Sequence, residues 1–289
     1  MIKSKTSGYK RFTRSKFGNF MYFFILTVAG LFTILPLIYS VITSFKPLNE
    51  LMIFPPRFYV VRPTFKNYAI LPELLSNLQV PFVRYLFNTL FLSILITILH
   101  VIAASMASFV ICQSELKAVK YLFAAVQFAL LYNTTTLAVP QYLIFSKLHI
   151  IDTFWVYILP MIPSAMGVFL IKQYMESGVP VALIEAAKID GAGVWRIFWK
   201  IVMPLIKPAW FTLTLFCFRD AWAIVPNGTV FTESLKTLPS VMAQVTSGGI
   251  ARSGSAMAVS VLLMIPPFVV YFISQSNVME TMSSAGIKD

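Results

Sequence analysis

Two groups of residues in this chain could take part in chemistry, and they lie in different surroundings. Arg219 and Asp220 interrupt an apolar run, where a guanidinium, a carboxylate and the nearby indole of Trp222 suit the hydroxyl groups of a polar solute. Glu185 and Asp190 stand among small residues, where their carboxylates offer fixed acceptors for charged donors. The first group therefore suits a solute, and the second suits a docking surface.

The remaining reactive side chains form no catalytic or metal-binding pattern. Cys112 and Cys217 lie in apolar stretches without metal-ligand spacing, which indicates buried thiols, and His100 and His149 are isolated. The sequence has no phosphate-binding Gly-x-x-x-x-Gly-Lys-Ser/Thr loop and no Ser/His/Asp, Cys/His or paired-carboxylate set. We therefore expect no enzymatic activity, no metal and no cofactor bound by this chain.

The composition is that of a membrane protein. Of 289 residues, 58% are hydrophobic and only 12% are charged, and the mean hydropathy is +0.78. A soluble domain carries about 25% charged residues. The net charge of +12 comes from residues that fall between apolar runs. A nucleic-acid-binding protein would gather its charge on one water-exposed face, so we expect no nucleic-acid partner.

Six apolar segments are long enough to approach the roughly 20 residues that a spanning helix needs. The first follows a basic flank, but its apolar run exceeds the 7–15 residues of a signal peptide and no small-x-small cleavage site follows, so we expect a retained helix. The predicted fold is an all-α membrane protein with six transmembrane helices. They are Phe20–Ile42, Tyr85–Cys112, Tyr121–Phe145, Thr153–Ile171, Ala209–Pro226 and Gly254–Ser274.

The distribution of lysine and arginine predicts the orientation. If the N-terminus is cytoplasmic, the inner segments hold 14 basic residues and the outer segments hold 8, which with Arg219 in the bilayer makes the 23 in the chain. Both termini should then be cytoplasmic. We divide the chain into a basic N-terminal segment (1–19), a six-helix domain (20–274) and a C-terminal tail (275–289), and we expect the proline-rich outer loop between the first two spans to be irregular with short helical pieces.

Arg219 and Asp220 should lie near the bilayer midplane, because Asp220 follows the end of the preceding loop at Pro208 by about a dozen residues of 1.5 Å rise each. Charges there cost at least about 2.5–3.5 kcal/mol each unless they face a cavity or a partner. Neighbouring helical side chains diverge by about 100°, so we expect the two not to pair with each other. The group could line a translocation path, or it could clamp helices or subunits together. The candidate path residues are Asn133, Arg219, Asp220 and Trp222.

The inner loop 172–207 predicts a helix–turn–helix elbow between the fourth and fifth spans. Pro180 is suited to begin a helix, and Gly191 is suited to end it and turn the chain. A second helix over Val194–Met203 would place Trp195, Phe198, Trp199 and Val202 on one apolar face. On the first helix, Ala186 and Ala187 would form a small-residue patch that lets a partner approach closely.

The run from Glu185 to Pro208 resembles the EAA loop of ABC importer permeases, through Glu185-Ala-Ala-x-x-Asp190-Gly191-Ala and Met203-Pro204-Leu205. The resemblance covers the run without a gap. It implies that this loop forms the coupling helices that sit in a cleft of a separate ATPase subunit. The residues implied in this interface are Glu185, Ala186, Ala187, Asp190, Gly191, Ala192, Gly193 and Pro204.

Two further segments resemble carbohydrate permeases. Leu148–Pro160 is similar to the segment before the fourth span in sugar permeases of the maltose type, and 275–289 resembles the C-terminal signature of the LplC-like branch, which imports complex oligosaccharides. Thr281 and Asp289 depart from the glycines common in the sugar-family tail, which argues against the maltose branch itself and leaves the substrate open.

The resemblance also implies the mechanism, the location and the partners. The mechanism would be alternating access, and the location would be a bacterial cytoplasmic membrane. This permease subunit would work with a second homologous permease, two ATPase subunits, an extracellular solute-binding protein and a sugar or oligosaccharide. The outer loop between the last two spans would contact the binding protein through Glu233, Gly248, Gly249 and Arg252. The alternatives are a stand-alone secondary transporter of a small polar solute, for which the internal repeats often seen in that class are not evident, and a membrane scaffold.

Overall fold

Helices are the regular structure of this chain wherever the computed structural model describes it, over residues 16–74, 80–131, 134–226, 228–246 and 249–286. The all-α prediction is confirmed, but continuous spans are fewer than the six predicted. Within the described residues, four helical segments are long and apolar enough to cross a membrane, and one bent pair makes a fifth. The four are α1 (Lys16–Ser44), α5 (Phe82–Gln113), α8 with α9 (Trp155–Gly178) and Ser253–Ser276 of α15 (Ser253–Gly286); the bent pair is Val194–Leu205 with α13 (Lys207–Trp222).

The third predicted span, Tyr121–Phe145, is not one helix. The structure has α6 (Lys117–Ala129), a short 3₁₀ turn at Thr134–Leu137 and α7 (Ala138–Lys147). Pro140 has no N–H to continue a helix from the preceding turn but is tolerated in a first turn, which favours a new helix starting just before it, as α7 does. Asn133 lies outside the described residues.

The fourth span is also divided, although its two helices together are long enough to cross. α8 (Trp155–Met161) ends before Pro163, and α9 (Ala165–Gly178) begins after Ser164, whose hydroxyl accepts a hydrogen bond from Gly167 N at 2.8 Å. His100 of α5 bridges the break, because its Nδ1 lies 2.6 Å from the carbonyl oxygen of Met161. A carbonyl can only accept, so Nδ1 carries the proton.

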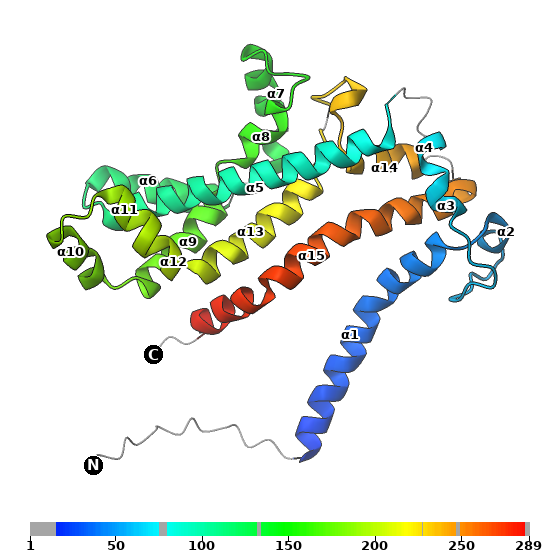
Figure 1. Cartoon of the computed structure of the whole chain (residues 1–289), viewed down its shortest axis with the longest axis horizontal. Coiled ribbons are helices and arrows are strands. Elements are labelled where there is room, and N and C mark those ends of the chain that lie inside the picture. The colour runs from blue at the N-terminus through cyan, green and yellow to red at the C-terminus, as the bar shows by residue number, and fades with distance from the viewer. Residues whose placement is uncertain (1–15, 75–79, 132–133, 227, 247–248, 287–289) are drawn as a thin grey trace.

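The long α5 is the central helix of the bundle. It packs against α9 and α13, while α15 lies along α13 (Figure 1). α10 and α11 lie at one end of α5, and the helices of the outer loops lie at its other end (Figure 1). Several buried hydroxyls on α5 donate to carbonyls one turn earlier, as Thr89 does to Tyr85 and Ser93 does to Thr89, so these hydroxyls are satisfied by their own helix.

α1 stands apart from the bundle. It meets α15 near its C-terminal end and diverges from it towards its N-terminus (Figure 1). No residue in the most apolar stretch of α1 is buried. Its apolar surface therefore depends on lipid or on another chain for cover.

The first outer loop is irregular with short helices, as predicted. These are α2 (Leu48–Leu51), α3 (Lys66–Ala69) and α4 (Leu71–Leu74). Asn67 fastens the loop to the end of α1, because its Nδ2 donates to the carbonyls of Ser44 and Lys46 at 2.8 and 2.7 Å. The second outer loop contains a 3₁₀ turn (Glu233–Leu235), α14 (Leu238–Thr246) and a second 3₁₀ turn (Gly249–Arg252).

Candidate functional site

The predicted elbow is present, and its turn has a defined hydrogen-bond pattern. α10 (Val181–Ile189) follows Pro180 and ends at Asp190, and Gly191 then adopts a left-handed φ of 76°. Gly191 N donates to the carbonyl of Lys188 and Ala192 N donates to that of Ala187, at 3.1 and 2.9 Å. These two bonds make a Schellman motif, which fixes the direction in which the chain leaves α10.

The exposed face of α10 differs from the predicted one at a single position. Glu185, Ala186 and Asp190 are exposed, but Ala187 is buried. Ala187 packs into the main apolar core together with Ile184. Ala186 is thus the small residue exposed on α10, whereas Ala187 holds α10 against the core of the helix bundle.

The second arm of the elbow is helical, but its apolar face is rotated from the predicted one. It consists of α11 (Val194–Ile197), a π turn (Phe198–Val202) and α12 (Met203–Leu205). Phe198 and Val202 are buried as expected, whereas Trp195 and Trp199 are 64% and 45% exposed. A π turn bonds i to i+5 and so holds an extra residue, which brings Phe198, Val202 and Ile206 into one buried row.

The elbow is continuous with the core of the spans. The same apolar cluster contains Ile184 and Ile197 of the elbow, Val101 of α5 and Leu213 of α13. The rings of Phe109 and Phe198 lie 5.4 Å apart, centroid to centroid. After Pro204 the chain bends by 81° at Ile206 to begin α13. Because interiors are close-packed, a displacement of the elbow must displace α5 and α13 as well.

Arg219 and Asp220 pair with each other, which corrects the expectation that they could not. The guanidinium Nη2 and Nε lie 2.8 and 3.0 Å from one carboxylate oxygen of Asp220. The Arg219 side chain is long enough to reach across the 100° between neighbouring positions. Both side chains are exposed, at 66% and 55%, so the pair lies on an open face of α13.

Trp222 does not share that face. It is 3% exposed, and its Nε1 donates to the carbonyl of Leu263 on α15 at 2.8 Å. Its ring stacks on that of Phe218. Trp222 therefore joins α13 to α15 within the chain.

The second outer loop is held by side chains that the sequence did not single out. Asn88 of α5 is fully buried, and its Nδ2 donates to the carbonyls of Ser234 and Lys236 at 2.8 and 3.0 Å. Leu238 N donates to the hydroxyl of Thr89 at 2.7 Å. An asparagine one turn inside an apolar helix is a signal that could have found this anchor, because a buried amide requires partners.

Asp152 holds the neighbouring part of the same loop, just before Ser234. Its carboxylate accepts hydrogen bonds from the Thr232 hydroxyl and from the backbone N–H groups of Thr232 and Phe231. These bonds, chiefly those from Thr232, stabilise the charged form and lower the pKa of Asp152 from its ordinary value. The backbone of Asp152 is left-handed, with φ 61°, which asparagine and aspartate tolerate better than most residues.

The described members of the predicted binding-protein contacts fall in two 3₁₀ turns of this loop. Glu233 is half-buried and forms an ion pair with Lys236. Gly249 and Arg252 are exposed in the second 3₁₀ turn. Gly248 lies outside the described residues.

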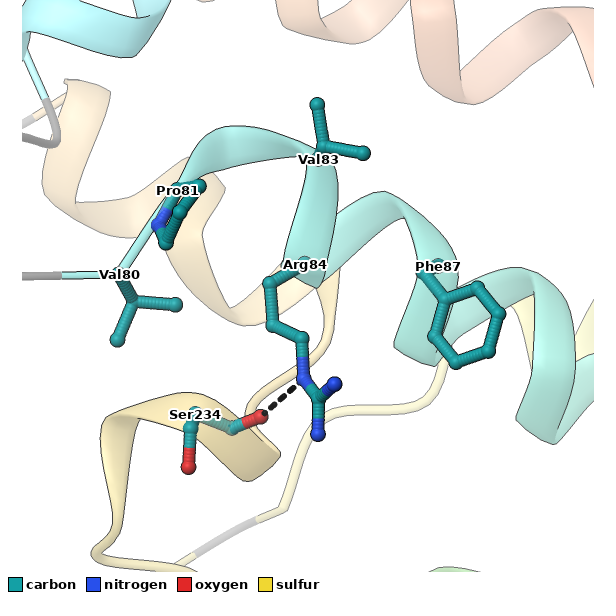
Figure 2. A pocket seen from close by; sticks show the side chains of 6 residues that line it. All are labelled: Val80, Pro81, Val83, Arg84, Phe87 and Ser234. Atoms are coloured by element: carbon teal, nitrogen blue, oxygen red, sulfur yellow. Dashed lines mark hydrogen bonds between the residues drawn. The ribbon is translucent and has the colours of Figure 1, made fainter.

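A pocket of about 580 Å³ opens beside this loop at the N-terminal end of α5. Figure 2 shows Arg84 crossing from α5 to the loop, where its Nε donates to the carbonyl of Ser234 at 3.4 Å. The side chain of Phe87 lies one turn further along α5 (Figure 2). The pocket presents a guanidinium and an apolar rim at the foot of the loop.

No group of three or more His, Cys, Asp or Glu side chains is placed to hold a metal ion within the described ranges. The thiols of Cys112 and Cys217 are both free.

Comparison with known proteins gives relatives of one kind, although no protein-family profile matches the chain. An inner membrane ABC transporter permease protein, YcjP of Escherichia coli K12, is 24% identical over 260 residues, which cover 89% of this chain and 91% of that protein. The arabinooligosaccharides transport system permease protein AraQ of Bacillus subtilis 168 is 25% identical over 272 residues, or 93% and 94% of the two chains. A chain in the crystal structure of a bacterial ABC transporter that imports the acidic polysaccharide alginate superposes with a TM-score of 0.76 over 93% of this chain and 99% of that one, at 21% identity.

Proposed function

Because the chain belongs to the permease subunits of carbohydrate ABC transporters, we propose that it forms one half of the membrane pathway of a binding-protein-dependent oligosaccharide importer. As a permease it is the non-catalytic transport component of such a machine, a multi-pass membrane protein. The oligosaccharide class is supported by the arabinooligosaccharide permease among its relatives and by its likeness to the alginate importer.

The coupling step rests on the elbow. The exposed Glu185, Ala186 and Asp190 are the surface offered to an ATPase subunit, with Gly191, Ala192 and Gly193 at the turn. ATP and Mg²⁺ would be bound by that subunit. Its closure would push α10, and the shared apolar core would carry the displacement into α5 and α13. Alternating access follows if these helices reorient around the pathway.

The pathway itself is proposed to run along the open face of α13 that carries Arg219 and Asp220. A paired guanidinium and carboxylate present donors and acceptors together, which suits the hydroxyl groups of a sugar. Exposed charges in a spanning segment need water or a partner chain. A second, homologous permease facing this surface would enclose the pathway. The binding protein would dock on the outer loop, where Asn88 and Asp152 hold the loop backbone in place.

The proposal depends on one observation: α10 has an exposed face and a buried face, and the adjacent residues Ala186 and Ala187 lie on different ones. These two positions provide a test and its matched control. A cysteine at Ala186 is exposed, and a cysteine at its neighbour Ala187 is buried. In the assembled transporter, a bifunctional thiol crosslinker should join Ala186→Cys to the ATPase subunit. It should form no crosslink between Ala187→Cys and that subunit. If Ala186→Cys captures no ATPase subunit, the proposed coupling surface is wrong.

The pathway is tested by uptake. Arg219→Gln and Asp220→Asn keep the side-chain shapes and remove the charges, and the double variant removes both together. We expect each to lower oligosaccharide uptake while the ATPase subunits remain bound. Trp222→Phe is the control from the buried face of α13, and it should transport normally. Unchanged uptake in all the charge variants would exclude this face as the pathway and favour a structural clamp.

A further inference from the structure

A second cavity lies on a different side of α13 from Arg219 and Asp220. It is a groove of about 490 Å³ between α5, the π turn of the elbow and the start of α13. On α13 it is lined by Lys207, Trp210 and Thr214, which recur at three- and four-residue intervals and so form one stripe. At 100° per residue, Arg219 and Asp220 lie about 140° and 120° to either side of Thr214. The groove therefore faces away from the pathway proposed above.

Most side chains that line the groove are apolar. The groove opens onto the outer surface of the helix bundle. Ile98 of α5 is 52% exposed and Trp199 is 45% exposed. From Lys207 to Thr214 the groove follows α13 for about 10 Å at 1.5 Å per residue. A groove of this length accommodates part of a lipid acyl chain.

The mouth of the groove is cationic. No acidic side chain lines the groove, and in the described part of the chain Lys207 forms no ion pair; its amine lies 5.7 Å from the ring centroid of Phe211. Arg196 and Lys200, on the same helical arm as Trp199, are exposed and likewise make no ion pair within the described ranges. Tryptophan and lysine together are the side chains that anchor proteins at the membrane–water boundary.

We infer that this groove binds an anionic phospholipid of the cytoplasmic leaflet, with an acyl chain between α5 and α13 and the phosphate at Lys207. The inference takes from the proposed function the cytoplasmic placement of the elbow and the pathway on the other face of α13. A lipid held there lies against the 81° bend between α12 and α13, where it would brace the arm that links the elbow to the span.

Photoactivatable lipids test this directly in the complete transporter, reconstituted in phosphatidylcholine nanodiscs. We expect a phosphatidylglycerol probe to label peptides containing 97–102 and 199–214 about fivefold more than a phosphatidylcholine probe, since one lysine near a surface contributes about that ratio. Lys207→Gln should reduce phosphatidylglycerol labelling to the phosphatidylcholine level. Lys117→Gln, which removes the same charge from the exposed start of α6, should not.

Ile98→Trp supplies a second variant, because it fills the groove from an exposed position and should reduce labelling by both probes. Equal labelling by the two lipids, or labelling unaffected by Lys207→Gln, would overturn the inference. A groove covered by the second permease would yield no adduct from either probe, and that result would overturn it too. Labelling as expected alongside a failed Ala186→Cys crosslink would count against the proposed function alone.

Discussion

Replacing Gly191 by alanine should loosen the turn of the elbow without creating any clash. The φ of Gly191 is 76°, and a Cβ built there meets no atom within 4 Å, so the whole penalty is backbone strain. The left-handed conformation costs an L-residue about 1–2 kcal/mol. That energy shifts the equilibrium between the closed and the open turn by a factor of roughly 5–30.

Hydrogen exchange of two amides measures this shift, since the N–H groups of Gly191 and Ala192 close the turn by donating to Lys188 and Ala187. In Gly191→Ala, both amides should exchange roughly 5–30 times faster. ATPase activity should also become less dependent on substrate-loaded binding protein, because a loose elbow transmits less displacement.

Gly193→Ala is the matched control. Its φ of −67° is ordinary for alanine, and its Cβ also meets open space. Gly191→Asn is a second comparison, because asparagine tolerates the left-handed region better than alanine does. If Gly193→Ala disturbs exchange and coupling as much as Gly191→Ala does, the left-handed turn is not the feature that matters.

Three other outcomes are expected. Asn88→Ala removes two hydrogen bonds to loop carbonyls and should loosen the second outer loop by roughly 1–3 kcal/mol, visible as faster limited proteolysis with the elbow unaffected. Because its folded pKa is lowered, Asp152 should hold the same loop above the ordinary pKa of aspartate and release it as the pH falls below about 4, an acid step that Asp152→Asn should lack. Trp222→Phe loses the bond to Leu263 and should lower the unfolding free energy by about 1 kcal/mol, measured by chemical denaturation in detergent; no change would mean that the bond contributes nothing net.

The elbow could be predicted because its signals are local. Pro180 and Gly191 fix the start and the end of α10 through their own backbone preferences, whatever surrounds them. The four helical segments that are long and apolar enough to cross a membrane were also predictable, since a run of about 20 apolar residues identifies such a segment by itself. The location of both termini in the cytoplasm stays a prediction.

The predictions that were wrong or missing concern features that are set by residues distant in the sequence. Nothing local distinguishes Ala187 from Ala186, and only the packing of α10 against the spans buries one and exposes the other. The third predicted span has a favourable apolar length, which outweighed in the prediction the signal from Pro140 that a helix starts shortly before it. The loop anchors Asn88 and Asp152 act on residues about 80 or more positions away, so their partners could not be identified from the sequence.

The π turn at Phe198–Val202 gives the elbow a property that an ordinary helix would lack. Because it holds one surplus residue, the part of the arm before it is out of phase with the residues after it by about one position, or about 100°. Deleting a single residue there would let the arm close into a regular helix and would rotate α12 about the axis of the arm, and α13, which leaves the arm at an 81° bend, would swing with it. Every side chain along that span, the charged pair included, would then face a different neighbour.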